Sequence, residues 1–345
     1  MVSAVILSEG FLGTTYGKTA NGLCRFSRRF QIKTVIDSTK AGLKIEDIVP
    51  KADTNIRIVS NLKEAIELND DLDTLIVGVA TDGGFLPQNF RHYITEAIEG
   101  GINIVSGLHE FVSDDPEFSQ LALKNGTKIT DVRKMFMLRR DFFTGRIFQV
   151  KSKKIAVLGT DSAIGKRTTA VYLNEEMKRR GKLSVMIGTG QTAWMQGFPY
   201  TVVIDSMIND FMPGGIESTI VEAWEKERPD FMFLEGQGSV IHPAYPGSFE
   251  LIAAGKPDAI VLQHAPKRLD YDGFDGIRIP PLDKFIRILE ELSDKKVIAI
   301  SINRENMEKD EMDRAINDIE KKYGVYAFDP LSDLKKVGDV IESKV

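Results

Sequence analysis

Short apolar runs alternate with segments of helical spacing along the N-terminal part of the chain. The runs are rich in Val and Ile, which favours strands, and the other segments repeat apolar residues at helical intervals. The expected strands cover residues 5–7, 34–36, 74–79, 102–105 and 127–132, and the expected helices cover 62–68 and 93–98. Strands that alternate with helices predict parallel βαβ units. We therefore expect a Rossmann-like domain over residues 1–140.

A second alternating series begins at Lys154, after a basic and aromatic segment that we interpret as a linker over residues 141–153. The expected strands cover residues 155–158, 184–187, 201–204, 231–234, 259–262 and 297–300, and the expected helices cover 169–179, 282–292 and 308–323. This series predicts a second α/β domain with a mainly parallel sheet over residues 154–345.

Composition narrows the class of protein. The chain has 345 residues, of which 42% are hydrophobic and 28% charged, so it can bury a sizeable core. Its net charge is -5, which argues against a nucleic-acid partner, because phosphate backbones select clustered Lys and Arg. The apolar start at residues 1–7 is too short for a signal or membrane helix. We expect a cytoplasmic protein without a membrane partner, and a homo-oligomer because symmetric assemblies are common.

A phosphate-binding loop is the clearest motif. Residues 155–169 read IAVLGTDSAIGKRTT, so an apolar strand runs into a glycine-containing loop and then into a helix. Gly165 lets the backbone approach a phosphate, the helix start adds positive potential, and Lys166 adds a mobile charge. The predicted phosphate-binding residues are Gly159, Thr160, Asp161, Ser162, Gly165, Lys166, Arg167, Thr168 and Thr169. The second domain is therefore expected to be P-loop NTPase-like.

The loop departs from the pattern G-x-x-x-x-G-K-[ST] in two places. Thr160 occupies the first glycine position, with Gly159 one residue earlier, and Arg167 occupies the hydroxyl position after the lysine. Thr168 or Thr169 can then reach a magnesium ion, or Arg167 adds a bidentate phosphate contact and no magnesium is present. The form G-T-D-x-x-x-G-K resembles the phosphate loop of dethiobiotin synthetase.

Polar segments follow several of the expected strands. The segment FMFLEGQGS places Glu235 at a strand end and Gln237 two residues later, where a magnesium- or water-orienting acid sits in such sheets. The segment GTGQTAWMQG offers Gln191 for ligand positioning. The acids Asp205, Asp210 and Glu217 follow; the first two, with Thr168, are candidate metal ligands, and a helix cap or surface charge is the alternative for each. Pro213-Gly214-Gly215 is expected to interrupt a helix between Asp210 and Glu217.

Two histidines lie close to these segments. His242 follows the Glu235 loop, and His264 ends an expected strand just before Lys267 and Arg268. A neutral imidazole beside an acid can act as a general base, although a single histidine is more often a structural hydrogen-bonding group. The two cations can hold a substrate carboxylate.

The N-terminal domain carries weaker signals. Its glycines do not follow the spacing G-x-G-x-x-G, so a dinucleotide site is not supported, although Asp37 ends the second expected strand. Residues 81–84 and 106–109 end strands and could close one side of a site shared with the second domain. Cys24 has no convincing base nearby, and as the only cysteine it cannot form an intrachain disulfide.

Several motifs occur together in order: KTANGLxRFS, VIDSxxAG, GTDSAIGKRTT, GTGQT, DxxxxDFxxGGxE, EGQGSxxHP and PDAIVLQHAP. On these motifs the chain resembles a two-domain family, formerly of unknown function, that includes DgcN-like D-glutamate N-acetyltransferases. The resemblance implies transfer of acetyl from acetyl-CoA to the amine of D-glutamate, with the phosphate loop binding the cofactor.

The resemblance, taken with the residues above, assigns candidate roles. The catalytic candidates are Glu235, His242 and Gln237, and the substrate-binding candidates are Gln191, Glu217, His264 and Arg268. An ATP- and Mg²⁺-dependent ligase or kinase, as in dethiobiotin synthetase, is the alternative enzyme. A nucleotide sensor without turnover is the third hypothesis.

Overall fold

The computed structural model describes residues 1–332 and 334–345, and its contacts divide the chain into two compact units. The first unit contains Met1–Leu138 and Gln191–Pro199, and the second contains Arg139–Gly190 and Tyr200–Val345. The short helix α8 (Gln191–Gln196) therefore belongs to the first unit, although in sequence it lies between two strands of the second. The hydrophobic pattern of α8 does not indicate that it belongs to the first unit.

The described residues of the first unit form a parallel sheet of six strands in the order β3-β2-β1-β4-β5-β6. The strands are β1 (Val2–Leu7), β2 (Phe30–Ile36), β3 (Arg57–Val59), β4 (Thr74–Val77), β5 (Asn103–Ser106) and β6 (Ile129–Asp131). This is the strand order of the Rossmann fold, so the predicted fold of this domain is confirmed. Sequence reasoning missed β3, which is too short to show a hydrophobic period.

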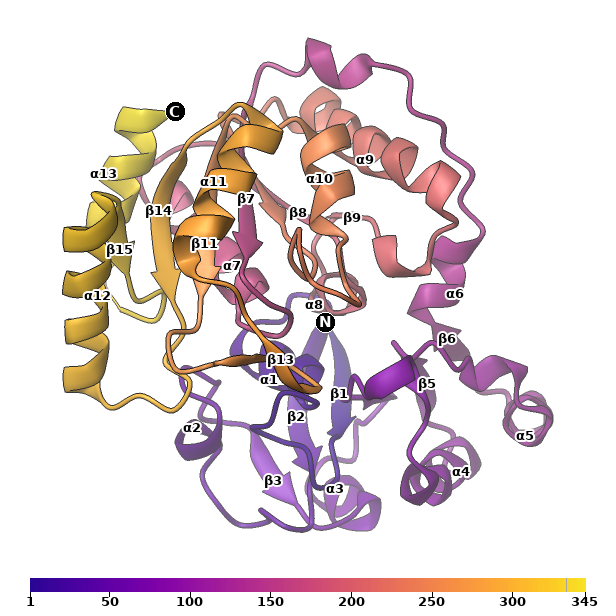
Figure 1. Ribbon diagram of the computed structural model, residues 1–345. Coiled ribbons are helices and arrows are strands. Elements are labelled where there is room, and N and C mark those ends of the chain that lie inside the picture. Colours follow the sequence, from indigo (N-terminus) through magenta and orange to yellow (C-terminus); the bar gives the residue numbers. More distant parts are fainter. Residues whose placement is uncertain (333) are drawn as a thin grey trace. The chain divides into compact units, whose positions relative to one another are not determined.

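Helices of the first unit pack against this sheet and against one another (Figure 1). They are α1 (Lys18–Arg25), α2 (Ile45–Ile48), α3 (Leu62–Leu68), α4 (Arg91–Glu99), α5 (Pro116–Asn125), α6 (Val132–Met137) and α8. Local chemistry sets their ends. The side chains of Asn61 and Asp115 cap α3 and α5 by accepting backbone N–H bonds, and left-handed Gly126 ends α5.

Among the described residues of the second unit, seven parallel strands form a sheet in the order β15-β14-β11-β7-β10-β8-β9. The strands are β7 (Lys153–Gly159), β8 (Ser184–Gly188), β9 (Tyr200–Thr201), β10 (Phe231–Glu235), β11 (Ala259–His264), β14 (Val297–Ile302) and β15 (Tyr326–Phe328), while β12 (Asp270–Tyr271) and β13 (Phe274–Arg278) form an antiparallel pair. Strand β7 lies between β10 and β11. The residues that follow these three strands therefore gather at one edge of the sheet.

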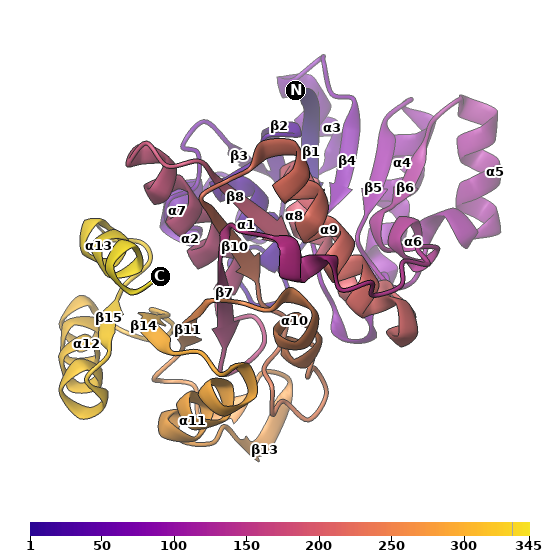
Figure 2. The same cartoon turned by 90° about the horizontal axis from the view of Figure 1, so that it is seen from above.

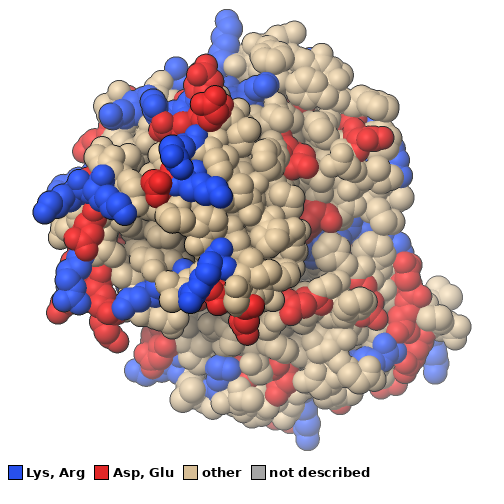
Figure 3. Space-filling model, viewed as in Figure 1, with Lys and Arg blue, Asp and Glu red and all other residues tan. Residues whose placement is uncertain are grey.

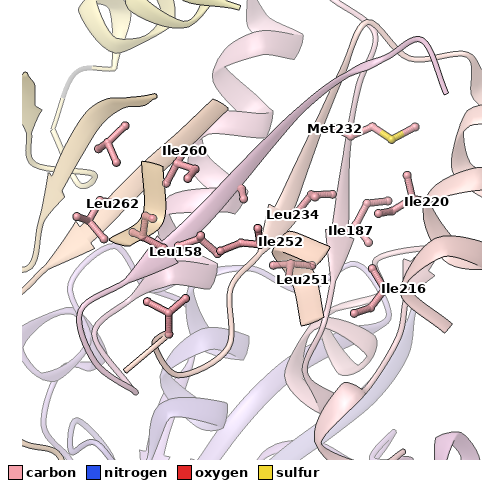
Figure 4. Close-up of a cluster of buried hydrophobic side chains, with 14 of the residues drawn as sticks. Leu158, Ile187, Ile216, Ile220, Met232, Leu234, Leu251, Ile252, Ile260 and Leu262 are labelled. Atoms are coloured by element: carbon pink, nitrogen blue, oxygen red, sulfur yellow. The ribbon is translucent and has the colours of Figure 1, made fainter. Parts of the chain in front are cut away.

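Helices cover both faces of this sheet (Figure 2), so its central strands are buried on both sides and read as continuous apolar runs. The helices are α7 (Lys166–Arg179), α9 (Met212–Glu227), α10 (Ser248–Gly255), α11 (Leu282–Ser293), α12 (Lys309–Tyr323) and α13 (Lys335–Lys344). Figure 4 shows Ile220 of α9 beside Ile187 of β8 and Leu251 of α10 beside Leu234 of β10, all within one buried apolar cluster. This core holds the strand ends in fixed register.

The expectation that Pro213-Gly214-Gly215 interrupts a helix is wrong. Pro213 lies in the first turn of α9, where the missing N–H would have no partner inside the helix. A Cβ on Gly214 would collide with the backbone carbonyl of Asp141, so glycine is needed at this position for close packing. The expected strand over 201–204 is also shorter, since Ile204–Ser206 forms a 3-10 turn.

Basic and acidic side chains are interspersed on the face of the molecule drawn in Figure 3. Many form local pairs, such as Lys226 with Glu222 one helical turn apart. None of the helices in the described part of the chain combines the length and the hydropathy that a membrane span requires.

Candidate active site

The phosphate loop connects β7 to α7. Its last residue, Gly165, has φ of +96°, a left-handed conformation that strongly favours glycine, and Ala163 is also left-handed with φ of +48°. This path lets the chain enter α7 with the first N–H groups of the helix unpaired within it, facing the end of β7. The local geometry is therefore that of an anion-binding turn.

Lys166 folds back over this loop. Its side chain is largely buried, and Nζ donates to the carbonyl of Asp161 at 2.6 Å. Gly159 makes room for the stem, because a Cβ there would lie 2.8 Å from Lys166 Cδ. A Cβ on Gly236, after the neighbouring strand β10, would also crowd this atom at 3.1 Å. The ammonium group is thus held within the loop, where it can exchange its carbonyl partner for a phosphate oxygen.

Asp161 anchors the loop from inside. Its carboxylate is fully buried; Oδ2 accepts from Arg268 Nη1 at 2.9 Å and from the backbone N–H of Asp272 at 3.0 Å, and Oδ1 lies 3.1 Å from His242 Nε2. Burial raises the pKa of Asp161, but the contacts with His242 and Arg268 outweigh it, and the pKa lies below its ordinary value. The carboxylate is therefore ionised and fixes the loop conformation.

His242 is buried within this network. Its Nδ1 accepts hydrogen bonds from the backbone N–H groups of Ala244 and Tyr245, both at 3.0 Å, so the proton of the neutral ring sits on Nε2, next to Asp161. The ring also packs edge-on against Tyr271, with centroids 4.6 Å apart. In this tautomer neither nitrogen has a free lone pair. The hydrogen bonding therefore favours a positioning role for His242 over the general-base role considered from the sequence.

The predicted carboxylate clamp is also occupied by partners within the chain. Arg268 donates to Asp161, to the carbonyl of Ser162 at 2.9 Å and to Glu305 at 3.0 Å. Lys267 pairs with Glu311 at 2.6 Å. Arg268 thus connects the phosphate loop to the segment after β14, and a substrate carboxylate would have to compete with these acids.

Glu235 lies beside the loop at the end of β10. Its side chain is buried; Oε2 accepts from the backbone N–H of Thr189 at 2.9 Å, and Oε1 lies 3.5 Å from Arg167 Nη1. Gln237 Nε2 donates to the hydroxyl of Thr189 at 3.2 Å. Because β7, β10 and β8 are neighbours, the structure brings together the loop, Glu235, Gln237 and the residues after β8. Sequence reasoning missed Thr189, which aligns this group.

His264 ends β11 on the other side of the loop strand. Its Nδ1 lies 3.1 Å from the hydroxyl of Thr160, and burial lowers the pKa of the ring from its ordinary value of 6.5 to about 4. The imidazole is therefore neutral at physiological pH. Thr169, in the first turn of α7, makes structural contacts close to this site. Its hydroxyl donates to Gln263 Oε1 at 2.5 Å and lies 3.1 Å from the Ser301 hydroxyl, so it connects α7 to the sheet.

The depressed pKa of His264 predicts a pH-dependent stability. The unfolded chain takes up a proton near pH 6.5 that the folded protein takes up only near pH 4, so stability falls as pH falls through this window. The shift corresponds to a loss of at most about 3 kcal/mol. We expect denaturant unfolding to show a flatter pH profile for His264→Gln than for the parent protein. Identical slopes in the two proteins would contradict the assignment.

Glu217 and the acidic metal-ligand candidates Asp205 and Asp210 lie on α9 and in the turns before it. Glu217, on α9, accepts from the N–H and hydroxyl of Thr144 and from the N–H of Ile147 at 3.1 Å, so it holds the segment after Leu138 onto the helix. Asp205 and Asp210 are exposed in turns before α9. Within residues 1–332 and 334–345, no three His, Cys, Asp or Glu side chains cluster as metal ligands. The roles of Asp205 and Asp210 as metal ligands stay predictions.

Comparison with known proteins decides the family. The family model described as the P-loop domain of a domain of unknown function, DUF1611_C, matches residues 141–338, and its Rossmann-like partner, DUF1611_N, matches residues 38–135. The chain belongs to the DUF1611 family. The resemblance drawn from the ordered motifs is thereby confirmed.

Two relatives carry an enzyme name. A D-glutamate N-acetyltransferase of Tritonibacter scottomollicae is 31% identical over 266 residues, which cover 74% of this chain and 77% of that protein. A protein of the same name from a Pseudoalteromonas species is 32% identical, over 75% of this chain and 78% of its own. The crystal structure of a DUF1611 family protein from Anabaena variabilis aligns with a TM-score of 0.88 at 27% identity, covering 100% of this chain and 99% of its own.

The first unit of this DUF1611 chain holds another candidate, Gln191. Its amide nitrogen donates to the hydroxyls of Thr19 at 2.7 Å and Thr192 at 2.9 Å, and the two hydroxyls lie 3.0 Å apart. Gly107 is needed beside this cluster, since a Cβ there would collide with the Gln191 side chain. The buried pair Thr19 and Thr192 was not predicted, because an isolated threonine carries no sequence signal of its partner.

The contacts of Asp37 and the burial of Cys24 indicate structural roles for both residues. Asp37 accepts from the N–H of Leu12 at 3.1 Å, from Thr39 and from Lys40 at 3.2 Å, which matches an ordinary turn at the end of β2. Burial raises the pKa of the Cys24 thiol to about 12, so it is a poor nucleophile.

Proposed function

We propose that this chain is an N-acetyltransferase that moves acetyl from acetyl-CoA to the amine of D-glutamate. The observation that carries the proposal is the buried Glu235 carboxylate at the end of the strand next to the phosphate loop. A base beside an anion-binding turn is what amine acylation by a phosphate-bearing donor requires. The names of the two relatives, both D-glutamate N-acetyltransferases, support the choice of the acetyl group and of the acceptor.

The loop residues fit the phosphates of CoA. The turn from Gly159 to Gly165 lets backbone N–H groups approach a diphosphate, and Lys166 and Arg167 supply two cations at the start of α7. Bound there, acetyl-CoA supplies a thioester acetyl group that an amine can attack. The loop binds these phosphates without cleaving them.

Glu235 performs the proton transfer in this proposal. D-glutamate arrives as an ammonium ion, and Glu235 accepts one of its protons. The free amine then attacks the thioester carbonyl, the C–N bond forms as the C–S bond breaks, and the second amine proton passes to the sulfur, so that CoA leaves as the thiol. The N–H of Thr189 keeps the carboxylate in place. The Gln237 amide, 3.2 Å from the Thr189 hydroxyl, is the donor placed to stabilise the thioester oxygen as negative charge develops on it.

Parallel assays of thiol release from acetyl-CoA and phosphate release from ATP test this activity. The purified protein would be given D-glutamate, L-glutamate and D-aspartate in turn. We expect thiol release that depends on D-glutamate and needs no ATP, together with N-acetyl-D-glutamate in the mass spectrum. Phosphate release that depends on an amino acid, without thiol release, would favour the ATP-dependent ligase or kinase instead.

Replacing Lys166 by alanine is expected to weaken binding of both CoA and ADP. Charge-assisted hydrogen bonds contribute about 1.5–3 kcal/mol, which corresponds to roughly a tenfold to hundredfold rise in Kd. Calorimetric titration measures this change. Lys178→Ala is the matched control, because it removes the same charge from the far end of the same helix. Equal affinities for Lys166→Ala and the parent protein would place the phosphates elsewhere.

A further inference from the structure

Arg167 occupies a position that P-loop NTPases give to a metal ligand. In the pattern G-x-x-x-x-G-K-[ST], the hydroxyl that follows the lysine coordinates the magnesium ion of the bound nucleotide. Here that position is the second residue of α7 and carries a guanidinium group. The guanidinium is permanently charged and has five N–H donors, so it repels a cation and binds anions.

The arginine faces the acid that would otherwise complete a magnesium site. Arg167 Nη1 lies 3.5 Å from Glu235 Oε1, and the two side chains are 18% and 4% exposed. The second oxygen of Glu235 accepts from Thr189 N–H. A divalent ion at this place would have to displace the arginine from Glu235 and sit beside a fixed positive charge in a poorly solvated setting. Burial lowers the pKa of Arg167, which reflects a desolvated cation that gains from an anionic partner.

The hydroxyl of Thr169 is committed elsewhere. Its oxygen donates to Gln263 and lies beside Ser301, both in the buried interior of the sheet. Of the two threonines predicted to substitute for the missing hydroxyl, this one is therefore already engaged by partners within the sheet. The guanidinium, in contrast, is planar and forked, which suits two oxygens of one phosphate group.

We propose that Arg167 replaces the divalent cation at this phosphate loop. The site then binds a diphosphate ester, such as the diphosphate of CoA or of a nucleoside diphosphate, without magnesium. Lys166 and Arg167 together neutralise the diphosphate charge, and Glu235 holds the guanidinium beside the loop. The inference rests on the proposed function for its choice of CoA, but the binding mode applies to any diphosphate ester.

Calorimetric titration with CoA and with ADP tests the inference, each in EDTA and in millimolar Mg²⁺. For the parent protein we expect the two affinities for each ligand to agree within about twofold. Arg167→Ala should weaken both ligands by roughly tenfold to hundredfold, and Arg167→Lys, which keeps the charge but loses the fork, should fall between. Arg179→Ala removes an exposed arginine from the far end of the same helix and should bind like the parent protein.

Arg167→Thr provides a second readout, because it restores the hydroxyl of the P-loop pattern. We expect it to bind ADP poorly in EDTA and to regain affinity when Mg²⁺ is added, which a merely misfolded variant would not do. A parent protein that binds ADP or CoA only with Mg²⁺ would overturn the inference, as would unchanged affinity in a folded Arg167→Ala variant. Magnesium-independent, Arg167-dependent binding without acetyl transfer would instead retain the inference and refute the proposed function.

Discussion

Replacing Glu235 by glutamine is expected to lower kcat for acetyl transfer to D-glutamate by about a hundredfold to ten-thousandfold, the usual contribution of a general base. Glutamine has nearly the same shape, and its carbonyl oxygen can still accept from Thr189 N–H, which lies 2.9 Å from the present carboxylate. The amide cannot take the proton of the substrate ammonium. The affinity for CoA, measured by titration, should change much less than kcat, measured by thiol release.

Glu225→Gln is the matched control for this prediction. Glu225 is an exposed carboxylate of the same unit, paired with Arg146, and its neutralisation should leave kcat unchanged. If Glu235→Gln retains kcat within a few-fold of the parent protein, Glu235 is not the base. If CoA affinity falls as far as kcat does, the carboxylate shapes the site instead of accepting the proton.

Asp161→Asn should reduce the free energy of unfolding of the second unit by about 3–5 kcal/mol, the usual cost of removing one partner from a buried ion pair. The Asp161 carboxylate is fully buried, and its loss leaves the buried Arg268 side chain facing a neutral amide at 2.9 Å. An amide also offers one oxygen where the carboxylate offers two. Because the carboxylate shapes the phosphate loop, CoA affinity should fall together with stability.

Denaturant unfolding, followed in parallel with CoA titration, measures both effects. Asp275→Asn, at an exposed position in the nearby strand β13, is the control and should stay within about 0.5 kcal/mol of the parent protein. An Asp161→Asn protein as stable as the control would show that the network around Asp161 is not what holds the loop.

The phosphate loop could be predicted from sequence because its determinants are local. A strand, a left-handed glycine, a lysine and a helix follow one another between residues 155 and 179, and each leaves its own mark on the sequence. Glu235 could be predicted from sequence for the same reason. An apolar run that stops at a carboxylate, just before a glycine, indicates the end of a buried strand. The strand orders then bring such ends together without further sequence signal.

The roles of His242 and Arg268 could not be predicted, because their partners are distant in sequence. Both contact Asp161, which lies 107 residues from Arg268, and only the folded chain shows that two backbone N–H groups fix the tautomer of His242. The sequence also does not reveal that α8 belongs to the first unit, because the apolar pattern of a short buried helix is the same whichever core it packs into. Gly214 led to a wrong helix prediction because glycine is required there by a tertiary contact with Asp141 and not by a break in the helix.

A crystal structure of the protein with bound CoA tests most directly whether this loop serves acetyl transfer. We predict that the CoA diphosphate lies on the backbone N–H groups between Gly159 and Lys166, within hydrogen-bonding distance of the Lys166 and Arg167 side chains. The thiol end should then approach Glu235. CoA bound at another surface, with the phosphate loop untouched, would contradict the account.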